Sequence, residues 1–359
     1  MKLATLVLIP TLVAAQVARL EVSETAGLKR FGYPVRTRIH TSLSPEKLRL
    51  TAQAAAVDAQ FTRIKEGVVE IDFALDLKPW EKRRFLVEEG VPRPVSSPMS
   101  IEQTATSYVV RYPAGLAFDV PKNLPGLLNS VKTPAFEYLM PGSAGLIFNG
   151  PGNVEHRAAA TTSRIVKSGP LACVLRFDST ERLGDRTVKS AVELEFPRSK
   201  SWAEVRWTVD DPDALVSGLI AEVNLRVEGQ PLIVDFGAGT MIYATVRRGQ
   251  SAKMRADASA WTIEVNGESY AAGRDQRAEG WAHVMDRRRA TAVAIGDFAD
   301  PEGSIETWAD GRLRIRRDHL DGIRKSLTFW LHFVDMPVQI GAATSPQSMM
   351  RPPVVRVEN

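Results

Sequence analysis

The stretch VEIDFALDL, residues 69–77, decides the fold class. Apolar side chains occupy every odd position of this stretch, and Glu70, Asp72 and Asp76 lie between them. A period of two places the apolar set on one face of a β-strand and the acidic set on the other. The stretch therefore predicts a strand with one packed face and one wetter face.

The same alternation recurs along the chain. Residues 192–196, 204–209 and 221–228 alternate apolar with polar side chains, and turn signals such as Asn266 with Gly267 separate the strands. Strands of this kind belong to antiparallel sheets, because such sheets pack one face and solvate the other. Residues 52–61 favour a helix most, but they show no clear apolar stripe. The chain is therefore predicted to be all-β, with sandwich or barrel architecture.

The composition is that of an ordinary globular protein, with 359 residues, 44% of them hydrophobic and 25% charged. It excludes wholesale disorder and a disulfide scaffold, and Cys173 is the single cysteine. No HExxH motif, cysteine cluster, nucleophile elbow or phosphate loop occurs, so we expect neither a metal centre nor a cofactor. The formal charge of +4 is weakly basic and predicts no nucleic-acid partner.

The N-terminus has the pattern of an export signal. Lys2 precedes the apolar run 3–15, which ends in small residues, so cleavage is predicted before Gln16 and the protein is expected to be secreted or periplasmic. The alternative is a buried first strand. No later segment approaches about 20 uninterrupted apolar residues, so no stable membrane insertion is predicted.

Two irregular regions rich in proline suggest how the chain divides. Turn residues gather at 92–98 and again at 121–152. Besides the signal peptide, we predict a small β domain at residues 20–95, a larger sandwich at 96–340 and a loosely held tail at 341–359.

Several short motifs resemble one known family. They include GYPV (32–35), KPWE (78–81), IVKSGPL (165–171) and GWAH (280–283). The early motifs resemble the RIFT-barrel domain of exo-rhamnogalacturonan-lyase-like proteins. The later ones resemble the β-supersandwich of that family, which is similar to galactose-mutarotase-type domains. The resemblance implies a small RIFT-type β-barrel followed by a large antiparallel β-supersandwich.

One departure from that family bears on function. Its lyases continue into a helical toroid domain, whereas no helical repeat follows Phe333 here. The resemblance therefore implies the sugar-recognition half of such a protein, with a partner chain as one source of a catalytic domain.

The loop NGPGNVEHR, residues 149–157, is the strongest local candidate for a site. A Gly/Pro/Asn loop tends to lie on the surface, and Glu155, His156 and Arg157 at its end supply a base, an acid and a carboxylate clamp. The alternative is a turn that precedes a solvated strand.

Two aromatic segments offer sugar platforms. Trp281 and His283 share one face of an extended segment, and Asp286 follows. A tryptophan stacks on the apolar face of a sugar while a histidine or aspartate bonds its hydroxyls. Trp330 and His332 form a similar pair, and core packing is the alternative explanation for both pairs.

A tyrosine completes the predicted site. Tyr243 follows the flexible stretch 237–239, and a neighbouring arginine would lower the pKa of its phenol. We predict three catalytic residues and five substrate-binding residues, which are His156, Tyr243 and His283, and Glu155, Arg157, Trp281, Asp286 and Trp330.

The preferred function is that of a secreted carbohydrate-active protein which binds an oligo- or polysaccharide in the supersandwich cleft. One option is a polysaccharide lyase that acts on a uronate-containing glycan. Its β-elimination needs a base and an arginine that neutralises the carboxylate. A glycoside hydrolase, which would need two carboxylates, fits less well. The alternatives are a non-catalytic sugar-binding or accessory module and a structural β protein of the envelope.

Overall fold

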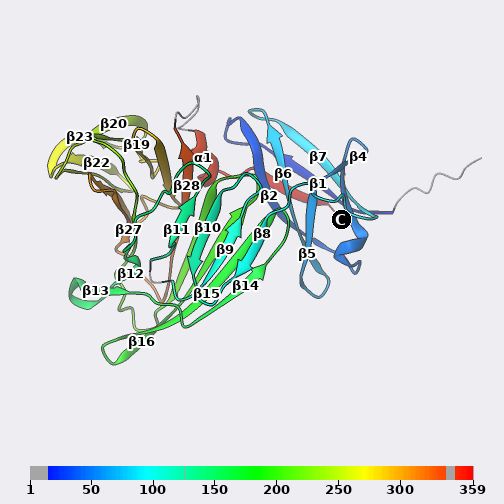
Figure 1. Ribbon diagram of the computed structural model, residues 1–359, viewed down its shortest axis with the longest axis horizontal. Helices are drawn as coiled ribbons and strands as arrows, with labels where there is room; N and C mark the ends of the chain where they lie inside the picture. The colour runs from blue at the N-terminus through cyan, green and yellow to red at the C-terminus, as the bar shows by residue number, and fades with distance from the viewer. Residues whose placement is uncertain (1–14, 125, 337–343, 359) are drawn as a thin grey trace, which may run out of the picture.

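The computed structural model describes residues 15–124, 126–336 and 344–358. Within them the protein is almost wholly β, as predicted, and its strands form five antiparallel sheets (Figure 1). The helical elements are one-turn or two-turn segments, namely η1 (Pro45–Lys47), η2 (Pro151–Asn153) and α1 (Thr344–Met350). The predicted signal peptide, residues 1–15, lies outside the described residues except for Ala15.

Two sheets form a small N-terminal unit. One has the order β29-β1-β7-β3-β4 and the other the order β2-β6-β5. The strands are β1 (Gln16–Ser23), β2 (Arg30–His40), β3 (Leu48–Ala52), β4 (Ala55–Val57), β5 (Ala59–Lys65), β6 (Val68–Leu77), β7 (Lys82–Glu89) and β29 (Val354–Glu358). The RIFT-type topology of this unit stays a prediction.

Strand β6 contains the stretch that predicts the fold. Val69, Ile71 and Phe73 are at most 2% exposed and pack into the core of the N-terminal unit. The opposite face is not wet, because Glu70 and Asp72 are buried as well. The expectation of a solvated acidic face is therefore wrong, since this face of β6 lies against the larger unit.

Two large sheets and a four-stranded sheet form the remainder. The nine-stranded sheet has the order β14-β15-β16-β17-β28-β25-β24-β19-β20, and the eight-stranded sheet has the order β13-β12-β18-β27-β26-β21-β22-β23. The four-stranded sheet has the order β11-β10-β9-β8. All three sheets contribute side chains to one apolar core, which is the arrangement expected of a packed β-sandwich.

The nine-stranded sheet carries the site described below. Its strands are β14 (Thr162–Lys167), β15 (Ala172–Leu183), β16 (Arg186–Pro197), β17 (Trp202–Asp210), β19 (Leu232–Ala238), β20 (Thr240–Val246), β24 (Trp281–Met285), β25 (Arg289–Ile295) and β28 (Arg324–Asp335). The alternating segments at residues 192–196 and 204–209 fall within β16 and β17, which confirms both as strands.

The other two sheets complete the sandwich. The eight-stranded sheet consists of β12 (Gly145–Asn149), β13 (Glu155–Arg157), β18 (Gly218–Asn224), β21 (Ser251–Asp257), β22 (Ala260–Val265), β23 (Glu268–Arg274), β26 (Glu302–Trp308) and β27 (Arg312–Asp318). The four-stranded sheet consists of β8 (Ser100–Gln103), β9 (Ser107–Arg111), β10 (Ala117–Pro121) and β11 (Ser130–Lys132).

The nine-stranded sheet is packed on both faces. One face contributes Val205, Leu331 and Phe329 to the sandwich core. Trp202 and Trp281, on the other face, belong to the core of the N-terminal unit. The N-terminal unit therefore docks on the outer face of this sheet, and the two units share a buried boundary.

The C-terminal segment differs from its prediction. Residues 344–358, the described part of the predicted loose tail, form α1 and β29, and β29 pairs with β1 in antiparallel register (Figure 1). Figure 1 shows the C-terminus in red among the blue N-terminal strands. The buried guanidinium of Arg30 donates to the carbonyl oxygens of Ser348 and Arg351. The expectation of a loosely held tail is therefore wrong for these residues, since main-chain pairing and Arg30 both hold them.

Candidate functional site

A cleft of about 830 Å3 lies on the outer face of the nine-stranded sheet. Strands β16, β17 and β28 supply its floor, and β2 and β6 of the N-terminal unit supply one wall. Met349 to Pro353 and Val355 of the C-terminal segment supply another wall. The cleft is therefore built where three parts of the chain, distant in sequence, meet.

Five aromatic residues line the cleft, and Phe73 and Phe298 are two buried members of this set. Trp330 on β28 is half-buried in the floor, while Trp202 and Tyr33 are buried. The rings of Tyr33 and Trp202 lie edge to face, with centroids 6.2 Å apart. Trp330 is thus the aromatic side chain that a ligand in the cleft would reach.

Two carboxylates lie beside Trp330. Glu204 on β17 is directly opposite Trp330 on one neighbouring strand and directly opposite Glu195 on the other. The indole N–H of Trp330 donates to Glu204. Arg206 lies 2.7 Å from Glu195 and 3.5 Å from Glu204, measured from nitrogen to oxygen. The floor therefore places an aromatic ring and two acceptor groups together.

The environment of Glu204 disfavours its charged form. Burial is the main cause, and the negative charge of Glu195 adds to it, so the pKa of Glu204 lies above its ordinary value despite Arg206. A perturbed carboxyl group in a cleft is a common feature of functional sites.

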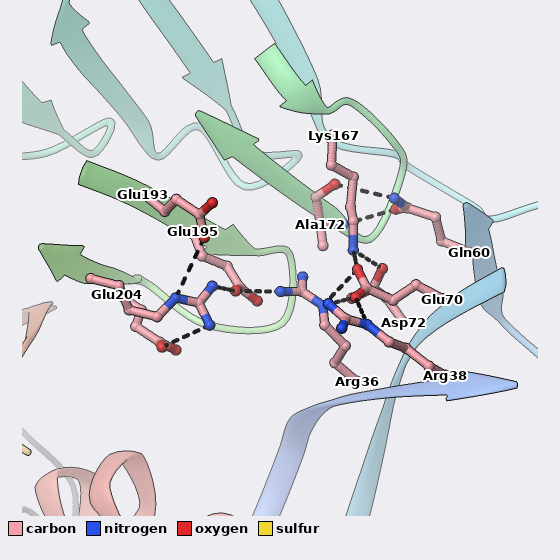
Figure 2. A network of polar contacts seen from close by, with 11 residues as sticks. Arg36, Arg38, Gln60, Glu70, Asp72, Lys167, Ala172, Glu193, Glu195 and Glu204 are labelled. Atoms are coloured by element: carbon pink, nitrogen blue, oxygen red, sulfur yellow. Dashed lines mark hydrogen bonds and ion pairs between the residues drawn. The ribbon is translucent and has the colours of Figure 1, made fainter. Parts of the chain in front are cut away.

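An ion-pair network connects this floor to the N-terminal unit (Figure 2). Arg36 on β2 lies 2.7 Å from Asp72 and 3.2 Å from Glu70, and it also bonds Glu195 across the boundary. Lys167, at the end of β14, pairs with Glu70 and lies 2.6 Å from Asp72. The network fixes Glu195 from the N-terminal side.

The structure places the predicted residues of β24 and β28 on one face. Trp330 lines the cleft. Trp281 and His283 share the same sheet face, with ring centroids 5.2 Å apart. Trp281 is only 2% exposed, however, and its indole N–H donates to Glu279. Core packing therefore accounts for Trp281 in this structure.

Tyr243 and His283 are connected through a third residue. Asp235 on β19 is directly opposite Tyr243 on one side and His283 on the other. Asp235 is buried 3.8 Å from Nδ1 of His283, and burial raises the pKa of Asp235 to about 6. Tyr243 is 53% exposed. These three residues form one row across the sheet.

The remaining predicted residues lie elsewhere. Glu155, His156 and Arg157 form β13, in the eight-stranded sheet, and Glu155 pairs with Arg314 at 2.9 Å. The carboxylate of Asp286 accepts hydrogen bonds from main-chain N–H groups in its own turn, so it stabilises that turn. The structure thus divides the predicted residues between two sheets.

The sequence reasoning missed the residues that give the cleft its chemistry. In the sequence, Glu195, Glu204 and Arg206 are polar positions of alternating strands, and Arg36 is not among the candidates. Their signal is present in the sequence, because acidic and basic residues share the polar face of the β17 segment. Nothing in that segment indicates that β2 covers the face.

Within the part of the chain that the structure describes, no group of three or more His, Cys, Asp or Glu residues is placed to hold a metal ion. None of the described helices is long and apolar enough to cross a membrane.

His332 gives the protein a predictable response to acid. Burial first, and then the charges of Lys200 and His283, lower the pKa of His332 from 6.5 to about 3. The folded protein therefore holds this side chain neutral, whereas the unfolded chain takes up a proton below pH 6.5. The contribution of the neutral His332 to the free energy of unfolding is full above pH 6.5, and it is lost as the pH falls from there towards 3.

We expect His332→Phe to remove this dependence. Between pH 7 and pH 5 the wild-type protein should lose about 2 kcal/mol more unfolding free energy than the variant does. Urea unfolding at both pH values measures the difference. His40→Phe is the matched control, because His40 is exposed and should leave the wild-type dependence intact. If the wild type and His332→Phe lost equal unfolding free energy between pH 7 and pH 5, the prediction would be wrong.

Comparison with known proteins gives a likeness of fold. No family model matches the chain, and the search of curated proteins finds no match. Among solved structures, an alpha-mannosidase from Enterococcus faecalis V583 is similar at 10% identity and a TM-score of 0.55. The match covers 96% of this chain and 47% of that one.

Two further structures are similar. A protein of glycosyl hydrolase family 38 from Enterococcus faecalis has 10% identity and a TM-score of 0.57, and the match covers 96% of this chain and 49% of that one. A putative aldose 1-epimerase from Klebsiella pneumoniae has 8% identity and a TM-score of 0.44, with 68% and 83% covered. The chain spans about half the length of the first two proteins. It shares an all-β fold with carbohydrate-active proteins, and the likeness extends to the fold alone.

Proposed function

We propose that this protein binds a saccharide in the cleft on the outer face of the nine-stranded sheet. The observation that carries the proposal is the half-buried Trp330, which lies beside Glu204 in a cavity of about 830 Å3. Ligand pockets of roughly this size, lined by aromatic rings and a few convergent polar groups, are typical of small-molecule sites.

The side chains fit the two surfaces of a sugar ring. The face of Trp330 stacks on the apolar C–H face of a pyranose, while hydroxyl groups at its edge donate to Glu204. The buried Trp202 and Tyr33 keep the adjacent wall rigid. Rigid walls favour affinity because little side-chain freedom is lost when the ligand binds.

The fold supports the proposal as an analogy. The two structures with the higher TM-scores are named as an alpha-mannosidase and a glycosyl hydrolase family 38 protein. Because this chain corresponds to about half of each, we propose saccharide binding rather than their activity.

Trp330→Ala should weaken saccharide binding by about tenfold or more, because the stacking surface is lost. A glycan array of neutral and acidic oligosaccharides identifies a ligand, and calorimetry then compares the variant with wild type. Trp330→Phe should lie between the two, since it keeps a smaller ring.

Tyr270→Ala is the control, because Tyr270 is an exposed aromatic residue on β23 and does not line the cleft. Thermal midpoints are measured for each variant. Unchanged binding by a folded Trp330→Ala variant, or no binding to any glycan by the wild type, would contradict the proposal.

The finer predictions of the sequence are separate from this proposal, and each needs its own test. Membership of the exo-rhamnogalacturonan-lyase-like family and lyase activity predict an unsaturated uronate product with ultraviolet absorbance. Export predicts a mature protein that begins near Gln16 outside the cytoplasm. A catalytic role for His156, Tyr243 and His283 predicts lost turnover in alanine variants.

A further inference from the structure

We propose that the cleft selects neutral saccharides over uronates, and that Glu204 sets this preference. The inference rests on the proposed function, since it assumes that a saccharide binds beside Trp330. It opposes the uronate option that the sequence left open.

The cation nearest to Glu204 is shared among several carboxylates. Arg206 lies 2.7 Å from Glu195, 3.5 Å from Glu204 and 4.0 Å from Glu193. One guanidinium therefore faces three carboxylates. Arg206 donates a hydrogen bond to Glu195, while its Nε has no hydrogen-bond partner. A fourth carboxylate, on a ligand, would still add a negative charge where one cation already faces three.

Three of the other four arginines that line the cleft also have partners. Arg36 forms ion pairs with Glu70, Asp72 and Glu195 (Figure 2). Arg351 lies 3.5 Å from Glu279, and Arg198 donates to two main-chain carbonyl oxygens at 2.7 and 2.8 Å.

Arg277 is the fifth arginine of the lining, and it is exposed. Solvent screening makes an exposed partner weak, so Arg277 compensates little of a buried ligand charge.

The floor already resists negative charge. Glu195 and Glu204 are opposite one another in register, and their side chains are 13% and 22% exposed. Burial and the charge of Glu195 hold the pKa of Glu204 above its ordinary value. A uronate carboxylate at the same place would be desolvated and repelled, and the nearby Arg206 and Arg36 each already face three carboxylates.

A neutral sugar meets the opposite situation. Hydroxyl groups are donors, and the carboxyl oxygens of Glu204 and Glu195 are acceptors. The same side chain thus attracts a hydroxyl-bearing ring and repels its oxidised counterpart. A residue that discriminates by repulsion in this way determines specificity more than affinity.

The test compares ligands that differ only in charge. Oligogalacturonate is compared with its fully methyl-esterified form, and mannuronan oligomers with β-mannan oligomers of equal length. The wild type should bind the neutral member of at least one pair about tenfold or more tightly than the acidic member. Glu204→Gln keeps the shape but removes the charge, and it should reduce that ratio several-fold.

Glu306→Gln is the matched control. Glu306 is a carboxylate on β26 that burial also affects, and it does not line the cleft, so its substitution should leave the ratio unchanged. The thermal midpoint of each variant is measured as well, and Trp330→Ala is included in the binding measurements.

The outcomes separate this inference from the proposed function. Uronates bound by the wild type as tightly as their neutral partners would overturn the inference and leave saccharide binding intact. A ratio unchanged in a folded Glu204→Gln variant would overturn the role of Glu204. If no glycan binds, the proposed function fails, and the inference fails with it.

Discussion

Lys167→Met is expected to lower the free energy of unfolding by about 3 to 5 kcal/mol, the usual cost of removing one partner from a buried ion pair. Lys167 is 5% exposed and pairs with Glu70 and Asp72, both of them buried (Figure 2). Burial alone would raise the pKa of Glu70, but the hydrogen bond from Lys167 and the charge of Arg36 hold it below its usual value. Without Lys167, buried negative charge loses a partner that water cannot replace.

Denaturant unfolding at pH 7 measures the loss, and the comparison with Lys82→Met isolates its cause. Lys82 is exposed and lies 3.7 Å from Glu21, so the same substitution there should leave stability almost unchanged. Similar stabilities for the Lys167→Met variant and the wild type would show that Arg36 and Arg38 alone compensate the two carboxylates.

The behaviour of β6 shows what a single sequence can and cannot reveal. Period-two alternation at residues 69–77 is a local property, and it predicts the strand and its apolar face correctly. The fate of Glu70 depends on Lys167, which is 97 residues further along the chain. Alternation distinguishes two faces but does not show what covers the second, so the network between the two units could not be predicted.

The cleft also depends on contacts between distant segments that local patterns do not reveal. Trp330 was predicted as a sugar platform because a tryptophan on a polar strand face is conspicuous. Its neighbour Glu204 comes from β17, and the register between β17 and β28 joins segments more than a hundred residues apart. Local composition favours the loop of Glu155, His156 and Arg157, and the structure places it on another sheet. Local composition therefore identified candidate residues but not the way in which they combine.

The order of the C-terminal segment is not visible in its local sequence either. Pro352 and Pro353 interrupt the pattern, and Val354–Glu358 is too short to be recognised as a strand from its sequence. Its partner, β1, lies at the opposite end of the chain. The pairing places Val355 in the wall of the cleft, so the tail has a structural role at the candidate site.

Arg30→Met should show how strongly that wall depends on one buried side chain. Arg30 is 2% exposed, lies 2.8 Å from Glu24, and donates to the carbonyl oxygens of Ser348 and Arg351. Its removal leaves the buried Glu24 without its cation and frees two carbonyls of the C-terminal segment. We expect a loss of about 3 to 5 kcal/mol in unfolding free energy.

A second readout distinguishes this effect from general destabilisation. The Arg30→Met substitution should speed the exchange of main-chain amides with solvent more in residues 344–358 than in β16 and β17. The reason is that the lost hydrogen bonds hold the C-terminal segment directly. The affinity for the saccharide should fall as well, since Met349 to Pro353 line the cleft.

Arg84→Met is the matched control. The Arg84 side chain is 85% exposed, and its contact is with Glu21 on a neighbouring strand, so stability and exchange should stay at wild-type values. If Arg30→Met raised exchange evenly across all strands, Arg30 would be a general core residue. Faster exchange confined to residues 344–358, together with weaker saccharide binding, would instead mean that a single guanidinium of the N-terminal unit keeps the far end of the chain in place as a wall of the cleft.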